Sequence, residues 1–145
     1  MEITKITAND YNCLKSLFKE EYDYHLTFCP ESLKEKKLLE EYSFNLLMKN
    51  TNRFGYKVKK NGKFIGFILC YLQNESIYIE DMCITKHYAR KGIGTLLINM
   101  IKIEARLKKK TKIETTIWGF NNKSQKLFEN QKAQIKKIDY EINLK

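Results

Sequence analysis

The chain has 145 residues, 43% of them hydrophobic and 12% aromatic, so it can bury one core and is expected to form a single domain over residues 1–145. No apolar run reaches the roughly 20 residues of a membrane span and no signal peptide precedes the first strand-like residues, which predicts a cytoplasmic protein without membrane contact. The formal net charge of +10 favours polyanionic partners, namely nucleic acid, an anionic membrane or a phosphorylated cofactor, or else reflects only a composition bias toward lysine.

The four cysteines predict neither a disulfide framework nor a metal site. No two of them form a C-x-x-C pair, and His25 and His87 complete no zinc pattern. Cys70 and Cys83 lie in apolar segments, so we interpret them as small core residues.

The first quarter of the chain predicts a strand over residues 3–6 and a helix that begins near Asn9 or Asp10. Residues 20–30 follow, an acidic and aromatic stretch that ends at the only proline. This stretch is interpreted in two ways. Either it is a substrate-facing loop in which acids attract a cation, or it is a helix end with core aromatics.

Residues 31–50 predict a second helix, and three antiparallel strands follow it. The first two strands cover residues 54–59 and 63–72, and the Asn61-Gly62 pair between them is a strong hairpin signal. A third strand begins at Ser76.

The central segment, residues 76–109, reads as a strand, a basic turn and a helix whose apolar residues recur at steps of three and four. In the turn, two glycines let backbone N–H groups approach a ligand, the helix start leaves unpaired donors, and Arg90 and Lys91 add positive charge. Together these features predict an anion site, usually for phosphate, although a plain turn with a solvated basic corner is the simpler alternative. The common nucleotide loops do not fit, since no G-x-x-x-x-G-K-[ST] occurs and Leu97 replaces the third glycine of a dinucleotide fingerprint.

The last part of the chain predicts a strand over residues 113–118, a short helix around Leu127, and a final strand region over residues 133–144 with a possible bend. The whole order predicts an α/β fold with a mixed, mostly antiparallel central sheet flanked by helices on both faces.

This order, with the glycine turn after the fourth strand, resembles the GNAT (Gcn5-related N-acetyltransferase) superfamily over the whole chain. The first motif is the acetyl-CoA turn Gln/Arg-x-x-Gly-x-Gly/Ala, here residues 89–94. The second is Asn-x-x-Ala/Ser-x-x-Leu/Phe-Tyr, here residues 121–128. The segment Tyr78 to Asp81 is weakly similar to the spermidine/spermine acetyltransferase branch.

The resemblance implies an enzyme that moves an acetyl group from acetyl-CoA to a primary amine by direct attack in a ternary complex, without a metal. It implies that the cofactor is bound by the end of the fourth strand, by the turn and by the second motif: Met82, Cys83, Ile84, Ala89, Arg90, Lys91, Gly92, Ile93, Gly94, Thr95, Asn121, Lys123 and Phe128. The acids and aromatics expected to face a small cationic amine or polyamine, which is slightly preferred as acceptor, are Glu21, Tyr22, Tyr24, Glu80 and Asp81.

Three departures from the family pattern bear on this expectation. Ala89 replaces Gln or Arg, although Arg90 directly after it can supply that charge, and Lys86 stands where proline is common. Phe128 replaces the tyrosine that usually protonates the leaving thiolate, and phenylalanine has no proton to donate. Water or one of the hydroxyls of Tyr22, Tyr24 and Tyr88 would have to take its place.

Amine transfer also needs a base, because a primary amine is mostly protonated at neutral pH. Glu80 is the first candidate, Asp81 the second and Glu114 a weaker third, each with a surface salt bridge as the alternative. On a regular strand Glu80 and Asp81 point to opposite faces, so only one would reach the cleft unless a bulge changes the parity.

Two other functions stay open at this point. Phe128 motivates a CoA-binding protein with little catalysis, and the net charge motivates a basic nucleic-acid-binding domain. The scattered basic residues and the lack of a nucleic-acid motif argue against the latter. A homodimer is also compatible with the sequence.

Overall fold

The computed structural model describes residues 1–34 and 37–145. In this part of the chain the elements follow in the order β1 (Glu2–Lys5), α1 (Tyr11–Phe28), η1 (Pro30–Lys34, a 3-10 turn), α2 (Glu41–Lys49), β2 (Arg53–Lys60), β3 (Lys63–Leu72), β4 (Ser76–Ile84), η2 (Lys86–Tyr88, a 3-10 turn), α3 (Ile93–Leu107), β5 (Lys112–Thr115) and α4 (Asn122–Asn130).

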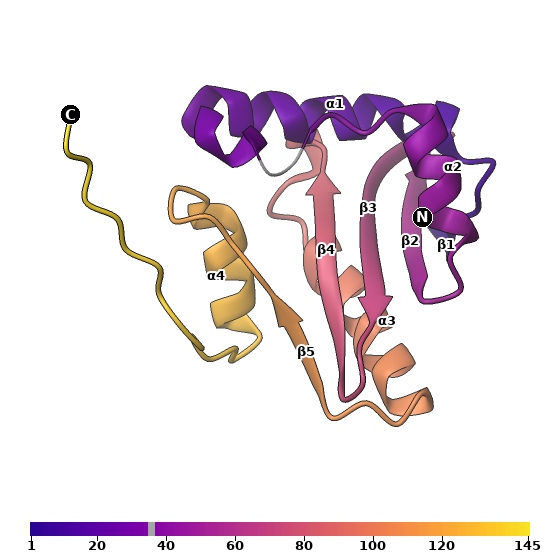
Figure 1. The fold of residues 1–145 in the computed structure, drawn as a ribbon. Helices are drawn as coiled ribbons and strands as arrows, with labels where there is room; N and C mark the ends of the chain where they lie inside the picture. Colours follow the sequence, from indigo (N-terminus) through magenta and orange to yellow (C-terminus); the bar gives the residue numbers. More distant parts are fainter. Residues whose placement is uncertain (35–36) are drawn as a thin grey trace.

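The described strands form one sheet in the order β1-β2-β3-β4-β5. Neighbours from β1 to β4 are antiparallel, and β5 lies parallel to β4. Helices α1 and α2 cover one face of the sheet, and α3 packs on the other (Figure 1). The predicted fold class, a mixed and mostly antiparallel sheet with helices on both faces, is confirmed.

Two apolar clusters hold these layers together, because alternate residues of each strand point to opposite faces. On the α3 face, Ile77 and Ile79 of β4 pack with Leu97 and Ile101 of α3. On the α1 face, Phe67 of β3 packs with buried side chains of α1 and α2, among them Leu14, Phe18 and Phe44.

Two predictions between residues 20 and 50 are decided by the structure. Of the two interpretations of residues 20–30, the loop is wrong and the helix end is correct, because α1 continues to Phe28 and the chain then enters η1. The predicted helix over residues 31–50 is wrong as one element: of its described residues only those of η1 and α2 are helical, and residues 37–40 have no regular secondary structure. Residues 35 and 36 lie outside the described part.

Two strand predictions also need correction. The predicted strand 113–118 is β5, which ends at Thr115. The final region 133–144 forms no strand in the described chain; it is an exposed tail that leads away from the sheet (Figure 1). A strand needs a partner for its backbone groups, and this segment has none there.

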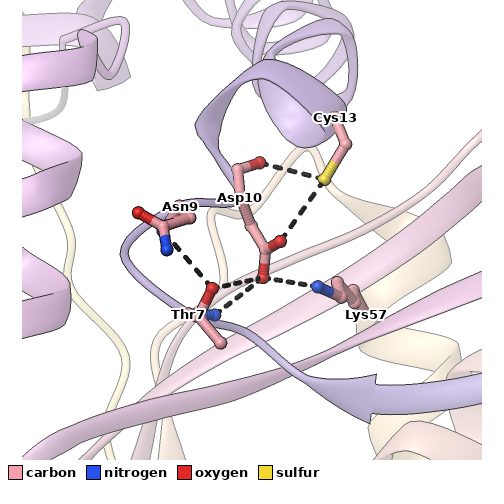
Figure 2. A network of polar contacts seen from close by, with 5 residues as sticks. All are labelled: Thr7, Asn9, Asp10, Cys13 and Lys57. Atoms are coloured by element: carbon pink, nitrogen blue, oxygen red, sulfur yellow. Dashed lines mark hydrogen bonds and ion pairs between the residues drawn. The ribbon is translucent and has the colours of Figure 1, made fainter.

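The start of α1 is tied to β2 by a small polar network around Asp10 (Figure 2). One carboxylate oxygen of Asp10 accepts hydrogen bonds from the Thr7 backbone N–H at 2.7 Å and from the Lys57 ammonium. The side chains of Asp10 and Lys57 are each only 13% exposed. Although burial acts to raise the pKa of Asp10, the hydrogen bonds from Lys57 and Thr7 outweigh it and hold that pKa below its ordinary value of 3.8.

Replacing Asp10 by Asn is therefore expected to lower the free energy of unfolding by about 1–3 kcal/mol at pH 7, because Lys57 keeps its buried charge without a counterion. The folded-state pKa is depressed, so this stabilisation is present above pH 3.8 and is lost as the pH falls through the folded-state pKa. Urea unfolding of both proteins across this range measures the difference.

The matched control is Asp23→Asn, which removes an exposed pair with Lys19 on the same helix and is expected to change stability by less than about 0.5 kcal/mol. Equal effects of the two substitutions would contradict the assigned role of Asp10.

Candidate active site at the parting of two strands

Strands β4 and β5 run side by side for only part of their length. Their paired residues end at Ile79 and Thr115, while β4 continues to Ile84. The Thr115 hydroxyl donates a hydrogen bond of 2.9 Å to the Ile79 carbonyl oxygen and closes the paired region. Beyond this point, the edge of β4 that faces away from β3 has no strand beside it among the described residues. The predicted cofactor residues Met82, Cys83 and Ile84 lie on this open edge.

A β-bulge lies in β4 at the same place. Cys70 of β3 is opposite Ile79 and Leu69 is opposite Asp81, so Glu80 is an extra residue in the strand. The extra residue shifts the alternation of side chains, and Asp81 therefore lies on the face of Leu69, which belongs to the core under α1.

Glu80 also lies on the α1 face. Its carboxylate forms an ion pair with Arg53 of β2. The Arg53 guanidinium lies 5.0 Å from the ring centre of Tyr71, which stacks on Tyr78 of β4. The strand is therefore not regular here: the bulge that the sequence analysis allowed for is present, and both acids lie on the α1 face.

Asp81 lines a small hollow of about 30 Å³ beneath α1. The predicted substrate residues Glu21 and Tyr22 line it too, together with His25, whose Nδ1 lies 3.0 Å from the Glu21 carbonyl oxygen. Side chains from the segment after η1, including Lys37, cover the hollow. Three of the residues predicted to face the acceptor are therefore brought together, although the hollow has room for only about one or two waters.

An aromatic cluster bridges α1 and the loop between β5 and α4. Phe120 packs edge-on against His25 at 5.3 Å and stacks on Phe28 at 6.1 Å between ring centres. The predicted substrate residue Tyr24 also touches Phe120, at 5.6 Å, and carries the Lys123 ammonium 4.7 Å above its ring. Tyr24 thus does not line the hollow with Tyr22.

Sequence reasoning missed Phe120 and Arg53 as residues of this region. Phe120 stands directly before the Asn121 motif, and its position there was the only available signal. The contact of Arg53 with Glu80 depends on the register of three strands, which the sequence does not display.

The basic turn leads into the N-terminus of α3. Gly92 is the N-cap with a φ of 81°, a left-handed conformation that favours glycine. The first hydrogen bond of the helix joins the Leu96 N–H to the Gly92 carbonyl, so the preceding N–H groups of residues 93–95 have no acceptor within the helix. Arg90 and Lys91 are exposed beside them, as the anion-site prediction requires.

The two glycines of this turn do different things. A Cβ at Gly92 would meet nothing within 4 Å, which leaves its surroundings open to a ligand. A Cβ at Gly94 would lie 2.9 Å from the Leu127 side chain, so Gly94 permits close packing of α3 on α4. Ile93 between them is buried in the core of the α3 face.

The second motif forms the start of α4. The Asn121 side chain caps the helix by accepting a hydrogen bond of 3.2 Å from the Ser124 N–H. Phe128 packs against the α3-face cluster, and Tyr88 packs against the same cluster. Of the three tyrosines considered as a replacement acid, Tyr88 alone shares this surrounding with Phe128, since Tyr22 and Tyr24 lie on the α1 side.

Cys83 lies in the part of β4 that continues beyond its pairing with β5. Burial raises the pKa of its thiol, and the carboxylates of Glu21 and Glu20 raise it further. Glu20 is held in place by a hydrogen bond of 2.7 Å from the Thr85 hydroxyl. A thiolate is the nucleophilic form of cysteine, so Cys83 is poorly suited to carry an acyl group.

Alkylation of Cys83 by iodoacetamide at pH 8 is therefore expected to be at least about tenfold slower than that of a free cysteine. The rate should keep rising above pH 9, because the folded-state pKa is higher than the ordinary value of 9.0. Mass spectrometry of the labelled peptides measures it, and the same protein unfolded in urea is the control. A plateau near pH 8.5 in the folded protein would contradict the raised pKa.

The described residues contain no group of three His, Cys, Asp or Glu side chains that could hold a metal ion. None of the helices there is long and apolar enough to cross a membrane. Glu114, the weaker base candidate, forms an ion pair of 2.6 Å with Lys136.

Comparison with known proteins supports the resemblance seen in the sequence. The model of the Acetyltransferase (GNAT) family matches residues 14–132. The tetramutant of the BH1408 protein from Bacillus halodurans has a similar structure, with a TM-score of 0.88 and 18% identity over 99% of this chain and 100% of that chain. A search of curated proteins finds no match.

Two further similar structures carry functional names. One is a ribosomal-protein-alanine N-acetyltransferase from Brucella melitensis biovar Abortus 2308, with a TM-score of 0.73 and 15% identity over 99% of this chain and 100% of that chain. The other is the aminoglycoside N-acetyltransferase AAC(6')-Iy in complex with CoA, with a TM-score of 0.74 and 11% identity over 99% of each chain. At these identities the structures show a shared fold and leave the acceptor open.

Proposed function

Because the chain belongs to the GNAT acetyltransferase family, we propose that it transfers an acetyl group from acetyl-CoA to a primary amine by direct attack in a ternary complex. The observation that carries this proposal is the bulge at Glu80, which turns two carboxylates toward α1 where β4 and β5 part. An acyl donor between the strands and an amine beneath α1 would meet at this point.

The donor would be held at two places. The N–H groups at the start of α3, with Arg90 and Lys91, suit the pyrophosphate of acetyl-CoA, since a helix N-terminus with added cations is a natural anion site. The pantetheine arm would then run along the open edge of β4, where Met82, Cys83 and Ile84 offer backbone hydrogen-bonding groups. A strand N–H there would polarise the thioester carbonyl.

Glu80 is proposed as the base that takes a proton from the amine, directly or through water. Its carboxylate is about one-third exposed and is positioned by Arg53, which in turn rests on Tyr71. Asp81, in the hollow with Glu21 and Tyr22, is proposed to hold the ammonium form of the acceptor before it loses that proton.

Direct attack is preferred over a covalent acyl-cysteine, because burial and neighbouring carboxylates raise the pKa of Cys83. The amine nitrogen would bond to the acetyl carbon, the carbon–sulfur bond would break, and CoA would leave as a thiolate. A thiolate is weakly basic, so water or the Tyr88 hydroxyl can protonate it in place of the tyrosine that Phe128 replaces.

A small cationic amine or polyamine is the preferred acceptor class. Glu21, Glu80 and Asp81 give this side of the cleft several carboxylates, and the stacked rings of Tyr71 and Tyr78 add an aromatic surface. The weak similarity of residues 78–81 to the spermidine/spermine branch points the same way.

The amine class is tested by measuring CoA release from acetyl-CoA with spermidine, spermine, a lysine peptide, a peptide with a free N-terminus and an aminoglycoside. CoA is quantified by chromatography, because thiol reagents would also label the four cysteines. Release with spermidine or spermine, and acetylated polyamine in the product, is the expected result. Release only with a peptide would contradict the acceptor class but leave the acetyl transfer intact.

Phe128 favours one other function, a CoA-binding protein with little catalysis. The substitution Phe128→Tyr distinguishes the two, because the Phe128 ring is partly buried against the α3-face cluster and a tyrosine there would restore the hydroxyl of the family motif. An enzyme that lacks only an efficient acid is expected to release CoA about tenfold faster with Tyr at this position. A protein that binds acetyl-CoA but stays inactive in both forms, with every amine, would support the binding function.

A further inference from the structure

Lys123 places a primary amine of the chain itself beside the parting of β4 and β5. It lies in the first turn of α4, within the second motif. Its ammonium lies 4.7 Å from the centre of the Tyr24 ring, and this cation–π contact directs the side chain toward α1. The Lys123 amine thus stands on the α1 side of the cleft, the side on which the acceptor amine is proposed to bind.

The start of α4 is held against α1 by aromatic packing. Phe120, in the loop before α4, stacks on Phe28 at the end of α1 (Figure 1). The Gln125 side-chain amide donates a hydrogen bond of 3.0 Å to the Gly119 carbonyl oxygen and ties the same loop to the helix. These contacts fix the backbone from which Lys123 extends, so its amine moves mainly on its own flexible four-carbon stem.

The charge of Lys123 also acts on the open edge of β4. Burial raises the pKa of the Cys83 thiol, neighbouring carboxylates raise it further, and the Lys123 ammonium opposes them. Cys83 lies where the pantetheine arm of the donor is proposed to run. The Lys123 amine is therefore close to the proposed path of the thioester as well as to the acceptor side.

Given the acetyl transfer proposed above, on which this step rests, we propose that Lys123 is an internal acceptor, which the chain acetylates at its own site when no other amine is bound. The Lys123 nitrogen loses a proton to solvent, or through water to Glu80, and attacks the acetyl carbon of bound acetyl-CoA. The nitrogen–carbon bond forms, the carbon–sulfur bond breaks, and CoA leaves as a thiolate that takes a proton from water. The product is a neutral acetyl-lysine.

Lys126 provides an internal control for this reaction. It lies three residues further along α4 and is exposed, as Lys123 is. Direct chemical acetylation by acetyl-CoA in solution would modify both lysines. A lysine that is held beside the thioester gains an additional advantage, because the two reactants need not be brought together. The ratio of the two rates therefore measures the contribution of the site.

The test incubates the full-length chain with acetyl-CoA and no added amine. Peptide mass spectrometry follows the acetylation of Lys123 and Lys126 over time at several protein concentrations. The variant Tyr24→Leu removes the ring on which the ammonium lies, and Tyr42→Leu, at a tyrosine of α2 that is 74% exposed, is its matched control. CoA release with the amines named above is measured on the same preparation.

Lys123 is expected to be acetylated at least about tenfold faster than Lys126, at a rate per chain that is independent of protein concentration. Tyr24→Leu is expected to slow the acetylation of Lys123 by about threefold or more, and Tyr42→Leu to leave it unchanged. Equal rates at Lys123 and Lys126, or a rate that rises with protein concentration, would overturn the proposal.

An unchanged rate at Lys123 in the Tyr24→Leu variant would overturn it as well. The amine panel separates this result from the proposed function. CoA release with an amine, but without preferential acetylation of Lys123, would overturn the internal acceptor alone. Absence of release with every amine, and of preferential acetylation, would count against both proposals.

Discussion

Glu80→Gln is expected to lower kcat/KM for the amine acceptor by about 10²–10³-fold at pH 7, because the protonated amine would lose its base. The remaining activity should rise steeply with pH, by up to tenfold per unit, since the reaction would then depend on the small fraction of free amine below a pKa of about 10.4. Asp81→Asn is expected to act mainly on KM, because its carboxylate is proposed to hold the acceptor's positive charge. Steady-state kinetics of both variants across about pH 6–9 measure these effects.

The matched control is Glu114→Gln on the neighbouring strand β5. The Glu114 carboxylate forms an ion pair with Lys136 of the C-terminal tail. This variant is expected to keep the parent rate within about twofold. A Glu80→Gln enzyme with unchanged rate and pH profile would contradict the role of the bulge. If Asp81→Asn lost activity while Glu80→Gln kept it, the role of the base would pass to Asp81.

Gly55→Ala is expected to have the largest effect on stability. Gly55 lies in β2 opposite Leu69, and a Cβ built there would stand 2.2 Å from the Ile68 carbonyl oxygen of β3. The obstructing atom belongs to the backbone, so a side-chain rotation cannot relieve the contact and the two strands must separate. We expect a loss of about 3–4 kcal/mol from the free energy of unfolding.

Urea unfolding followed by circular dichroism measures this loss. Gly119→Ala is the control, because a Cβ at Gly119 would meet nothing within 4 Å, and its effect is expected to stay within about 0.5 kcal/mol. A Gly55→Ala protein as stable as the control would show that β2 and β3 are farther apart than the structure has them.

The parts of the fold that could be predicted from the sequence are those with strong apolar periodicity. The strand predicted over residues 63–72 matches β3 in its bounds, and the strand, turn and helix predicted within residues 76–109 correspond to β4, the turn after it and α3. These elements form the centre of the molecule, where side-chain spacing must follow the buried faces.

The predictions that failed depend on contacts between distant segments. Residues 31–40 are rich in helix-forming residues, but of the described residues there Leu33 and Leu39 line the hollow beneath α1. The tail has a strand pattern and, in the described chain, lacks the neighbour that would make it a strand. Local propensity cannot supply either relation.

The candidate site could be predicted only in part, because its geometry also depends on contacts between distant segments. The residue types at Glu80, Asp81 and the glycine turn indicated the chemistry, and the turn lies at the N-terminus of α3 as expected. The orientation of the two acids follows from a bulge in the register of β3 and β4, and the Arg53 partner comes from a third strand. Register is a property of strand pairs and is not written in one strand's sequence.

Binding of acetyl-CoA to the turn is the most direct test of the central claim. Isothermal titration of the full-length chain with acetyl-CoA is predicted to show one site per chain, with affinity that falls as salt is added. The double substitution Arg90→Glu and Lys91→Glu is predicted to weaken binding by at least about tenfold, since it reverses the charge beside the start of α3. Absence of binding by the parent, or equal binding by parent and variant, would contradict the assignment of this turn as the cofactor site.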